Sequence, residues 1–410
     1  MTKVATRPPS SSRLSLGAAF ALGLGTGVAL AVAGPAVATD IDGTYRKLRV
    51  FGQVLSYVQA NYVESVPEEK LIYDAIGGML RDLDPHSTFM RPAEYLKLRE
   101  DTAGEFGGLG VRLTMADDGV FIDTVTPDGA AERAGVLGGD RIVHIDDVPI
   151  KGLDVSEVAR RLRGVPGTRV VLGLHRASWA APRDVALIRR FVRVNSVDHR
   201  LLSERIGYVR IHSFQERTDQ ELLEALSSLK QQLHDRSAGA LQGLVLDLRD
   251  NPGGLLDEGV KVADRFLRSG DIVRTEGRNP RAAEIQRAHP GGTEPEYPIA
   301  VLINRGSASA SEIVAGALQD HGRARLVGTR SYGKGSVQTL FGLDDGSGLK
   351  LTIARYYTPS GRSIQEVGID PDIVIADRPV EAASATDAVD PQLAAAVEAL
   401  RMSGSSPRRP

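Results

Sequence analysis

The chain has 410 residues, no cysteine and a formal net charge of −2. Its length suits two to three domains, each large enough to bury a core. The missing cysteine excludes a thiol nucleophile, thiolate metal sites and disulfides, and the near-neutral charge gives no reason to expect a nucleic-acid partner. Of the 50 basic residues, 41 are arginine and nine are lysine. We expect neither a metal nor a cofactor.

Residues 1–38 differ from the rest of the chain. They carry Lys3, Arg7 and Arg13, no acidic residue, and an uncharged apolar run that Pro35 interrupts before Ala36-Val37-Ala38. This order is typical of a secretory signal peptide, and an uncleaved membrane anchor is the alternative. Either one predicts export to a bacterial periplasm. If this segment is not cleaved, it would anchor the protein to the inner membrane.

Residues 39–97 are predicted to be a helical segment, because apolar residues recur at helical spacing from Tyr45 to Val58 and from Glu68 to Leu80. The pattern carries no chemistry of its own. It leaves open whether residues 44–65 form a homodimer or pair with another helix of the same subunit.

Residues 98–180 change character. Glycines cluster at 104, 107, 108 and 110, and short apolar alternations separated by turn residues follow. One amphipathic helix is expected from Asp154 to Leu162. The pattern predicts a small, partly open β-barrel with a helix.

Residues 181–378 return to strands that alternate with helices. The continuous apolar runs 244–248 and 299–303 are typical of buried strands, and each precedes a glycine- or serine-rich turn and a helix. This predicts an α/β (α+β) multi-domain protein. Residues 379–410 are rich in Pro, Ala and Ser, and are separated as a C-terminal tail that is expected to be peripheral or disordered, with a short helix from Gln392 to Leu400.

The first candidate for chemistry is a serine-rich turn. Ser309 follows the strand 299–303 and opens a helix, where the helix N–H groups and dipole favour a developing oxyanion. The alternative is helix capping, because Ser309 and Glu312 also form the S-x-x-E capping box.

The second candidate is Lys334, which lies between two glycines in a chain that otherwise prefers arginine. A serine nucleophile needs a base, and none of the eight histidines lies in a motif that marks it as one. Burial lowers the pKa of a lysine, whereas arginine stays protonated. Gln338, four residues on, is placed to orient the amine. The alternative is a lysine on a surface loop.

The third candidate is the turn that follows the strand 244–248. Gly253 and Gly254 present bare backbone N–H groups, as oxyanion holes do. The alternative is an ordinary Asn-Pro-Gly-Gly turn.

Together these motifs, in this order, resemble the carboxyl-terminal processing peptidases, also called tail-specific proteases. The resemblance covers residues 45–376 and rests on segments 83–90, 107–111, 248–254, 307–313, 333–338, 356–365 and 368–372. It implies a crotonase-like protease core with an inserted PDZ domain, and domains at 39–97, 98–180 and 181–378.

The resemblance also implies roles. Ser309 would be the nucleophile, Lys334 the general base and Gln338 the residue that positions the lysine. The oxyanion hole would use the N–H of Ala310 and one from Gly253 or Gly254, with the choice between the two glycines open.

In the PDZ domain, a loop would bind the carboxylate of a peptide's C-terminus and the peptide would add as a strand. The last side chain would enter an apolar pocket, unless the four apolar residues concerned are plain domain core. Arg163 would couple the loaded domain to the active site, or simply be a cation at a helix C-terminus. The implied peptide-binding residues are Gly108, Leu109, Gly110, Val111, Val158, Leu162 and Arg163.

The leading interpretation is an exported serine endopeptidase that recognises free, apolar C-terminal tails of proteins or peptides and cleaves upstream of them. The alternative is a non-catalytic PDZ scaffold, a pseudoprotease that binds C-termini. A chymotrypsin-like protease is disfavoured because Pro252 stands where its serine would be, and an acyl-thioester enzyme would explain neither the PDZ pattern nor the Ser–Lys pair. The sequence leaves open whether an adaptor protein delivers substrates.

Overall fold

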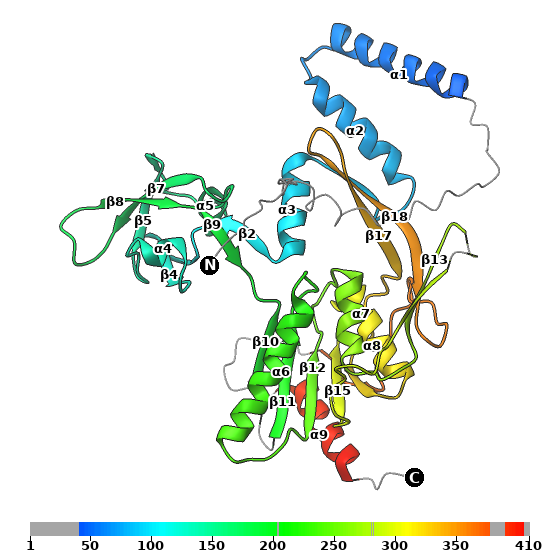
Figure 1. The fold of residues 1–410 in the computed structure, drawn as a ribbon. Helices are drawn as coiled ribbons and strands as arrows, with labels where there is room; N and C mark the ends of the chain where they lie inside the picture. Colours follow the sequence, from blue (N-terminus) through cyan, green and yellow to red (C-terminus); the bar gives the residue numbers. More distant parts are fainter. Residues whose placement is uncertain (1–40, 203–204, 280, 282, 378–389, 406–410) are drawn as a thin grey trace, which may run out of the picture. The chain divides into compact units, whose positions relative to one another are not determined.

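The computed structural model describes most of the chain after the predicted signal or anchor, and residues 1–38 lie outside it. The chain divides into two compact units, residues 1–72 and 73–410. None of the described helices is both long and apolar enough to cross a bilayer. The described ranges are 41–202, 205–279, 281, 283–377 and 390–405 (Figure 1).

The first unit contains α1 (Ile41–Asn61) and the start of α2 (Glu68–Arg81). Both helices lie in the segment predicted to be helical. Acidic residues in the first turn of α2 and Arg81 in its last turn complement the helix dipole. On α1, Leu48, Phe51 and Val54 are exposed. Dimerisation through residues 44–65 stays a prediction.

The short segment after α2 is held in place by hydrogen bonds to one carboxylate. The Asp84 carboxylate accepts hydrogen bonds from the N–H groups of His86 and Ser87 and from the Ser87 hydroxyl. The chain then forms β1 (Thr88–Met90) and α3 (Pro92–Ala103), which starts with proline and ends at a left-handed Gly104.

Residues 105–193 form a PDZ-like module (Figure 1). Its main sheet has the order β3-β4-β5-β7-β8, with β6 on β5, while β2 pairs with β9. Among the described strands, β3 therefore keeps one unpaired edge. The elements are β2 (Glu105–Gly108), β3 (Val111–Ala116), β4 (Gly119–Val125), α4 (Ala130–Arg133), β5 (Arg141–Ile145), β6 (Val148–Pro149), α5 (Val155–Leu162), β7 (Arg169–His175), β8 (Arg183–Ile188) and β9 (Arg190–Arg193).

Residues 197–374 contain a six-stranded sheet of order β10-β11-β12-β15-β16-β19. All neighbours from β11 onward are parallel, and β10 is an antiparallel edge strand. The elements are β10 (Val197–Leu201), β11 (Ile206–Ile211), α6 (Thr218–Asp235), β12 (Gly243–Asp247), α7 (Leu256–Asp264), β15 (Ile299–Ile303), α8 (Ala310–Asp320), β16 (Ala324–Gly328), β19 (Ile373–Val374) and α9 (Pro391–Ser405).

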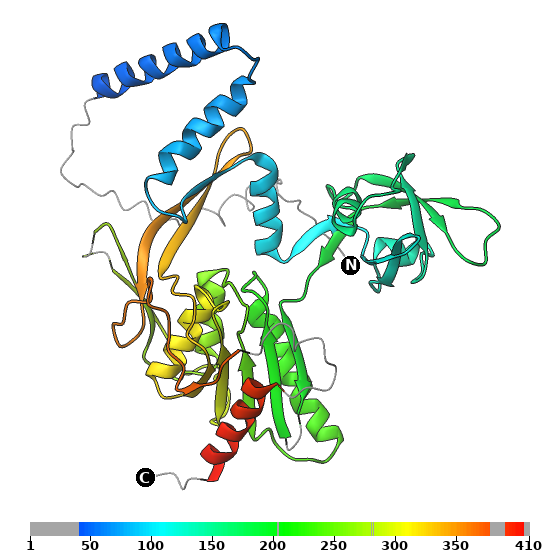
Figure 2. The same ribbon diagram turned by 180° about the vertical axis from the view of Figure 1, so that it is seen from behind.

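Helices cover both faces of this sheet (Figures 1 and 2). Alternate residues of β12 point to opposite faces, so Leu244 and Leu246 join a core with α6, α7 and α8, while Val245 joins a core with α9. On α9, Ala396 and Leu400 are buried against the strands. The segment separated as a tail at 379–410 thus contains a helix of the core.

Another sheet, of order β1-β18-β13-β14 with β17 on β18, completes the core. It carries the long hairpin that follows Lys334. Its strands are β13 (Asp271–Gly277), β14 (Glu284–Arg287), β17 (Ser336–Gly342) and β18 (Gly348–Tyr357). The mixed α/β core, the PDZ-like module before it and the N-terminal helical segment confirm the predicted fold class.

Candidate active site

A cavity of about 560 Å³ collects the predicted catalytic residues. The loops after β12 and β15 meet there because the two strands are parallel neighbours, and the carboxyl ends of parallel strands are where α/β proteins bind ligands. The lining includes Ser309, Lys334, Gln338, Gly253, Gly254, Leu98, Asp101, Thr102, Leu340, Lys350 and Tyr356.

Ser309 differs from the serines on either side of it. The Ser307 hydroxyl donates to the Leu248 carbonyl at 2.7 Å, and the Ser311 hydroxyl donates to the Asn251 carbonyl at 3.0 Å. Both flanking side chains are fully buried, so they tie the two loops together. Ser309 is the one of the three that lines the cavity.

The backbone of Ser309 is strained. Its φ of 58° and ψ of −116° lie outside the regions that L-residues favour, at a cost of about 1–3 kcal/mol. Gly253 lies against it, with a φ of 96°. A Cβ on Gly253 would lie 2.7 Å from both the Ser309 Cβ and the Ala308 carbonyl oxygen. Only glycine lets this loop approach the serine so closely.

The two candidate glycines have different hydrogen bonds. The N–H of Gly253 donates to the Asn251 side-chain oxygen at 2.9 Å. For the N–H groups of Gly254 and Ala310, the described residues provide no acceptor. In this structure the available donors beside Ser309 are therefore those of Ala310 and Gly254.

Lys334 lies in the loop between β16 and β17. Burial is the main cause that lowers the pKa of its amine, and the Lys350 ammonium lowers it further, whereas Glu312 acts in the opposite direction. Lowering the pKa of a lysine increases the fraction of neutral amine, which is the form that accepts a proton. On the following residue, Gly335, a Cβ would lie 2.5 Å from the Gln365 nitrogen, so glycine is required beside this lysine.

Glu312 joins the serine loop to the lysine loop. Its fully buried carboxylate accepts hydrogen bonds from the Ser309 N–H, the Ser331 hydroxyl and the N–H groups of Gly333 and Lys334, at 2.6–2.9 Å. Burial raises the pKa of Glu312, and the hydrogen bonds counteract that rise. The capping box predicted from the sequence is therefore present, and the same carboxylate also binds the loop that carries Lys334.

Gln338 lines the same cavity, but its amide faces another partner. The Nε2 group donates to the Ser336 hydroxyl at 2.7 Å and to the Ser336 carbonyl at 3.3 Å. Within the described residues no hydrogen bond joins Lys334 Nζ to Ser309 or to Gln338. Such bonds are often long in substrate-free enzymes and tighten when substrate binds.

Sequence reasoning did not find several groups near Lys334. Lys350 on β18 and the buried Tyr356 line the cavity, and the Tyr356 hydroxyl donates to the Lys334 carbonyl. The pKa of His86 is lowered by burial and then by the charge of Lys334. His86 lies in the segment 83–90, which contributes to the family resemblance. Its electrostatic interaction with Lys334 follows only from the fold, which places this segment beside β18.

The PDZ-like module contains the predicted peptide-binding residues. Leu109, Val158 and Leu162 are buried in its core, and Val111 packs against them partly buried. Binding of a tail's last side chain there stays a prediction. Within the described residues, the N–H groups of Leu109 and Gly110 have no acceptor.

Both ends of α5 are fixed. Asp154 accepts the Glu157 N–H at 2.7 Å at the start. At the other end the buried Arg189 donates to the carbonyls of Arg161 and Leu162. The Arg163 guanidinium lies 4.2 Å above the Phe106 ring, a cation–π contact. A coupling role for Arg163 stays a prediction.

Comparison with known proteins shows the family to which this chain belongs. A profile described as "Peptidase family S41" matches residues 205–375, and one described as "PDZ domain" matches residues 121–176. The carboxy-terminal-processing protease of Bartonella bacilliformis is 43% identical over 357 residues, which is 87% of this chain and 81% of that protein. The chain belongs to the carboxyl-terminal processing protease family. It is a serine-type peptidase with a PDZ domain.

A second relative agrees with this membership. The protease is 36% identical over 336 residues to the carboxyl-terminal-processing protease of a Picosynechococcus species, covering 80% of this chain and 78% of that one. A solved structure titled photosystem II D1 C-terminal processing protease is 33% identical with a TM-score of 0.45, covering 80% and 92% of the two chains. A profile described as "Activating protease CtpB N-terminal domain" matches residues 34–93.

Proposed function

We propose that the protease is an exported endopeptidase that cleaves with Ser309 as nucleophile and Lys334 as general base, upstream of free, apolar C-terminal tails. The observation that carries the catalytic part is the cavity at the strand ends. It is lined by Ser309, the one serine of its cluster not tied to the neighbouring loop, and by Lys334, whose pKa burial lowers.

The chemistry follows from these groups. The neutral Lys334 amine takes the proton of the Ser309 hydroxyl while Oγ attacks the carbonyl carbon of the scissile peptide bond. The N–H groups of Ala310 and Gly254 stabilise the oxyanion that forms. The Lys334 ammonium then gives its proton to the departing amine, and water attacks the acyl-enzyme by the same base assistance. Gln338 turns toward Lys334 to orient it.

Tail recognition is assigned to the PDZ domain. The N–H groups of Leu109 and Gly110 lack acceptors among the described residues, and β3 has an unpaired edge in the sheet. A carboxylate and an added strand match these two features. Gly108 completes the loop, and Leu109, Val111, Val158 and Leu162 supply apolar surface.

Export is proposed from residues 1–38 alone, with the periplasm as the destination. Cell fractionation tests it, and a cytoplasmic pool of full-length protein would contradict it.

The dyad predicts a specific pattern of loss. With an unfolded protein substrate that ends in an apolar residue, Ser309→Ala and Lys334→Ala should each lower kcat at least a hundredfold, because nucleophile and base act as a unit. Ser307→Ala serves as the neighbouring control and should retain catalysis in the fraction that folds. If either dyad variant cleaves at the wild-type rate, the dyad assignment is wrong. If the wild-type protein binds the tails but does not cleave them, the scaffold alternative is supported.

The pH dependence of activity should identify Lys334 as the general base, because a change at Lys350 should shift it. Activity should rise with pH through the lowered pKa of Lys334, since only the neutral amine accepts a proton. The charged groups that act on the pKa of Lys334 are Lys350, which lowers it, and Glu312, which raises it. Lys350→Gln removes a cation, so the pKa of Lys334 should increase and the rising limb should move to higher pH.

Lys350→Arg keeps the charge and is the matched control. Its limb should stay at the wild-type pH when kcat/KM is measured from acid to alkaline pH. Equal limbs for the wild type and Lys350→Gln would contradict the role of Lys350, and a flat wild-type profile would contradict a lysine base.

Tail recognition makes a separate prediction. Amidating the C-terminus of a peptide substrate removes its carboxylate, so kcat/KM should fall about tenfold or more, the value of one to two charge-assisted hydrogen bonds. The same peptide with an amidated internal side chain is the control. Equal cleavage of the free and amidated tails would argue against selection by the PDZ domain.

A further inference from the structure

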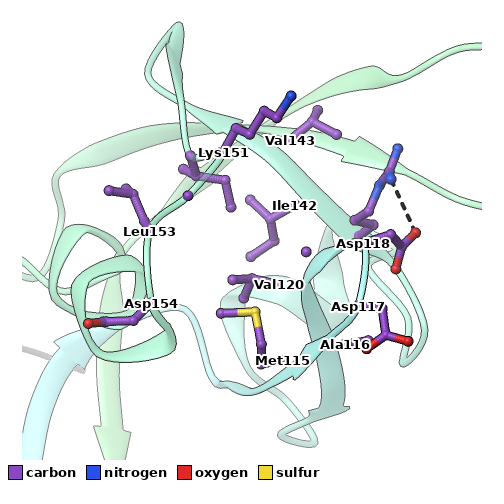
Figure 3. A pocket seen from close by; sticks show the side chains of 14 residues that line it. Met115, Ala116, Asp117, Asp118, Val120, Ile142, Val143, Lys151, Leu153 and Asp154 are labelled. Carbon is purple, nitrogen blue, oxygen red and sulfur yellow. Dashed lines mark hydrogen bonds and ion pairs between the residues drawn. The ribbon is translucent and has the colours of Figure 1, made fainter.

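A second cavity lies within the PDZ domain (Figure 3), and residues 108–110 are not part of its lining. Its volume is about 760 Å³, within the range of small-molecule and peptide side-chain sites. It is bounded by the end of β3, the turn that leads into β4, the middle of β5, and the chain that leads into α5. None of the roles derived above uses it.

This cavity continues the proposed peptide groove. The C-terminal end of α5 lies at the loop before β3, because the Gly164 N–H donates to the Gly107 carbonyl at 3.0 Å. The N-terminal end of α5 lies at the cavity, where Asp154 is part of the lining together with Met115 of β3. Both β3 and α5 therefore run between the proposed carboxylate loop and this cavity.

Strand geometry sets which residue of a tail reaches the cavity. A tail that adds to the open edge of β3, with its carboxylate at Gly108-Leu109-Gly110, runs antiparallel to β3. Each step upstream in the tail is one step forward along β3, and alternate side chains face the same way. If the last residue lies beside Val111, the third from the end lies beside Leu113 and the fifth beside Met115.

The lining has the character of an apolar pocket with a rim of mixed charge, because Lys151 and Arg141 belong to it together with three aspartates. Val120, Ile142 and Ile150 form buried walls, whereas the Met115 side chain is 49% exposed. Figure 3 shows Met115 beside Val120 and Ile142, with Asp117 and Asp154 on either side of it. These two carboxylates and that of Asp118, which pairs with Arg141 at 3.2 Å, are exposed.

We propose that this cavity is a distal subsite that binds an apolar side chain at the fifth residue from the C-terminus of the substrate tail. The inference rests on the proposed tail recognition and extends it. An acidic residue is disfavoured at this position, because its charge would have to be desolvated against the apolar walls. The protease thus selects a tail by two apolar side chains four residues apart, in addition to its free carboxylate.

The test uses full-length protein carrying Ser309→Ala, so that the peptides stay intact. Fluorescein-labelled ten-residue peptides of alanine and serine end in valine and carry Leu, Ser or Asp at the fifth residue from the end. Fluorescence anisotropy gives their Kd. The Leu peptide should bind about tenfold more tightly than the Ser peptide, the value of partly burying one leucine side chain, and the Asp peptide should bind most weakly.

Two substitutions make the test specific. Met115→Asp should abolish the preference for Leu over Ser. Val148→Asp, at a residue of β6 that is 50% exposed and absent from the cavity lining, should retain it. Circular dichroism checks that both variants fold.

The outcomes separate the subsite from tail recognition itself. Equal affinity for the Leu and Ser peptides, with binding still weakened by C-terminal amidation, overturns the subsite and leaves tail recognition standing. If amidation has no effect, tail recognition fails and the subsite fails with it. A Leu preference that Met115→Asp does not change also overturns the proposal.

Discussion

The buried carboxylate of Glu312 is the contact on which the rest of the active site depends. It accepts hydrogen bonds from the nucleophile loop through the Ser309 N–H and from the lysine loop through the N–H groups of Gly333 and Lys334. A carboxylate without such partners would not stay buried, because desolvation of a charge costs several kcal/mol. The same bonds that satisfy Glu312 therefore set the relative positions of Ser309 and Lys334.

This arrangement explains how segments far apart in the chain share one cavity. The lysine loop leads into the β17–β18 hairpin, and β18 brings Lys350 and Tyr356 to the cavity wall. Asp84 accepts a hydrogen bond from the Thr352 hydroxyl, and the Ser87 hydroxyl accepts the Thr352 N–H. These bonds hold the segment of His86 against the same strand. The strained Ser309 backbone persists because these surrounding contacts determine it.

The sequence predicts the elements whose signal is local. The apolar runs 244–248 and 299–303 correspond to the central strands β12 and β15, and the turns after them contain the glycines and the serine that line the cavity. The resemblance to a family then orders these motifs into roles. The S-x-x-E pattern at Ser309 was visible, but it indicates only the bond within one helix turn.

The remaining features depend on contacts between distant residues. Glu312 bonds to Ser331 and Gly333, which are 19 and 21 residues away, and Thr352 lies 268 residues from Asp84. No periodicity encodes such pairs. For α9 the sequence predicts a short helix at 392–400, but the burial of its Ala396 and Leu400 against the sheet depends on the same kind of distant contact. Lys334 stands out because two glycines flank it in a chain that prefers arginine, whereas Lys350, the second lysine of the cavity, has no such flanking motif.

The most direct test of this account measures how fast Ser309 reacts with a fluorophosphonate in the wild type, in Glu312→Gln, and in Glu284→Gln, a control at an exposed residue of β14. Mass spectrometry of the digested protein locates the adduct. A glutamine amide cannot accept all four hydrogen bonds, so Ser309 of Glu312→Gln should react at least a hundredfold more slowly. Urea unfolding should show that the free energy of unfolding of this variant is lower by about 3 kcal/mol. The wild type and Glu284→Gln should be labelled at Ser309 alike. Labelling of Glu312→Gln at the wild-type rate, with unchanged stability, would contradict the account.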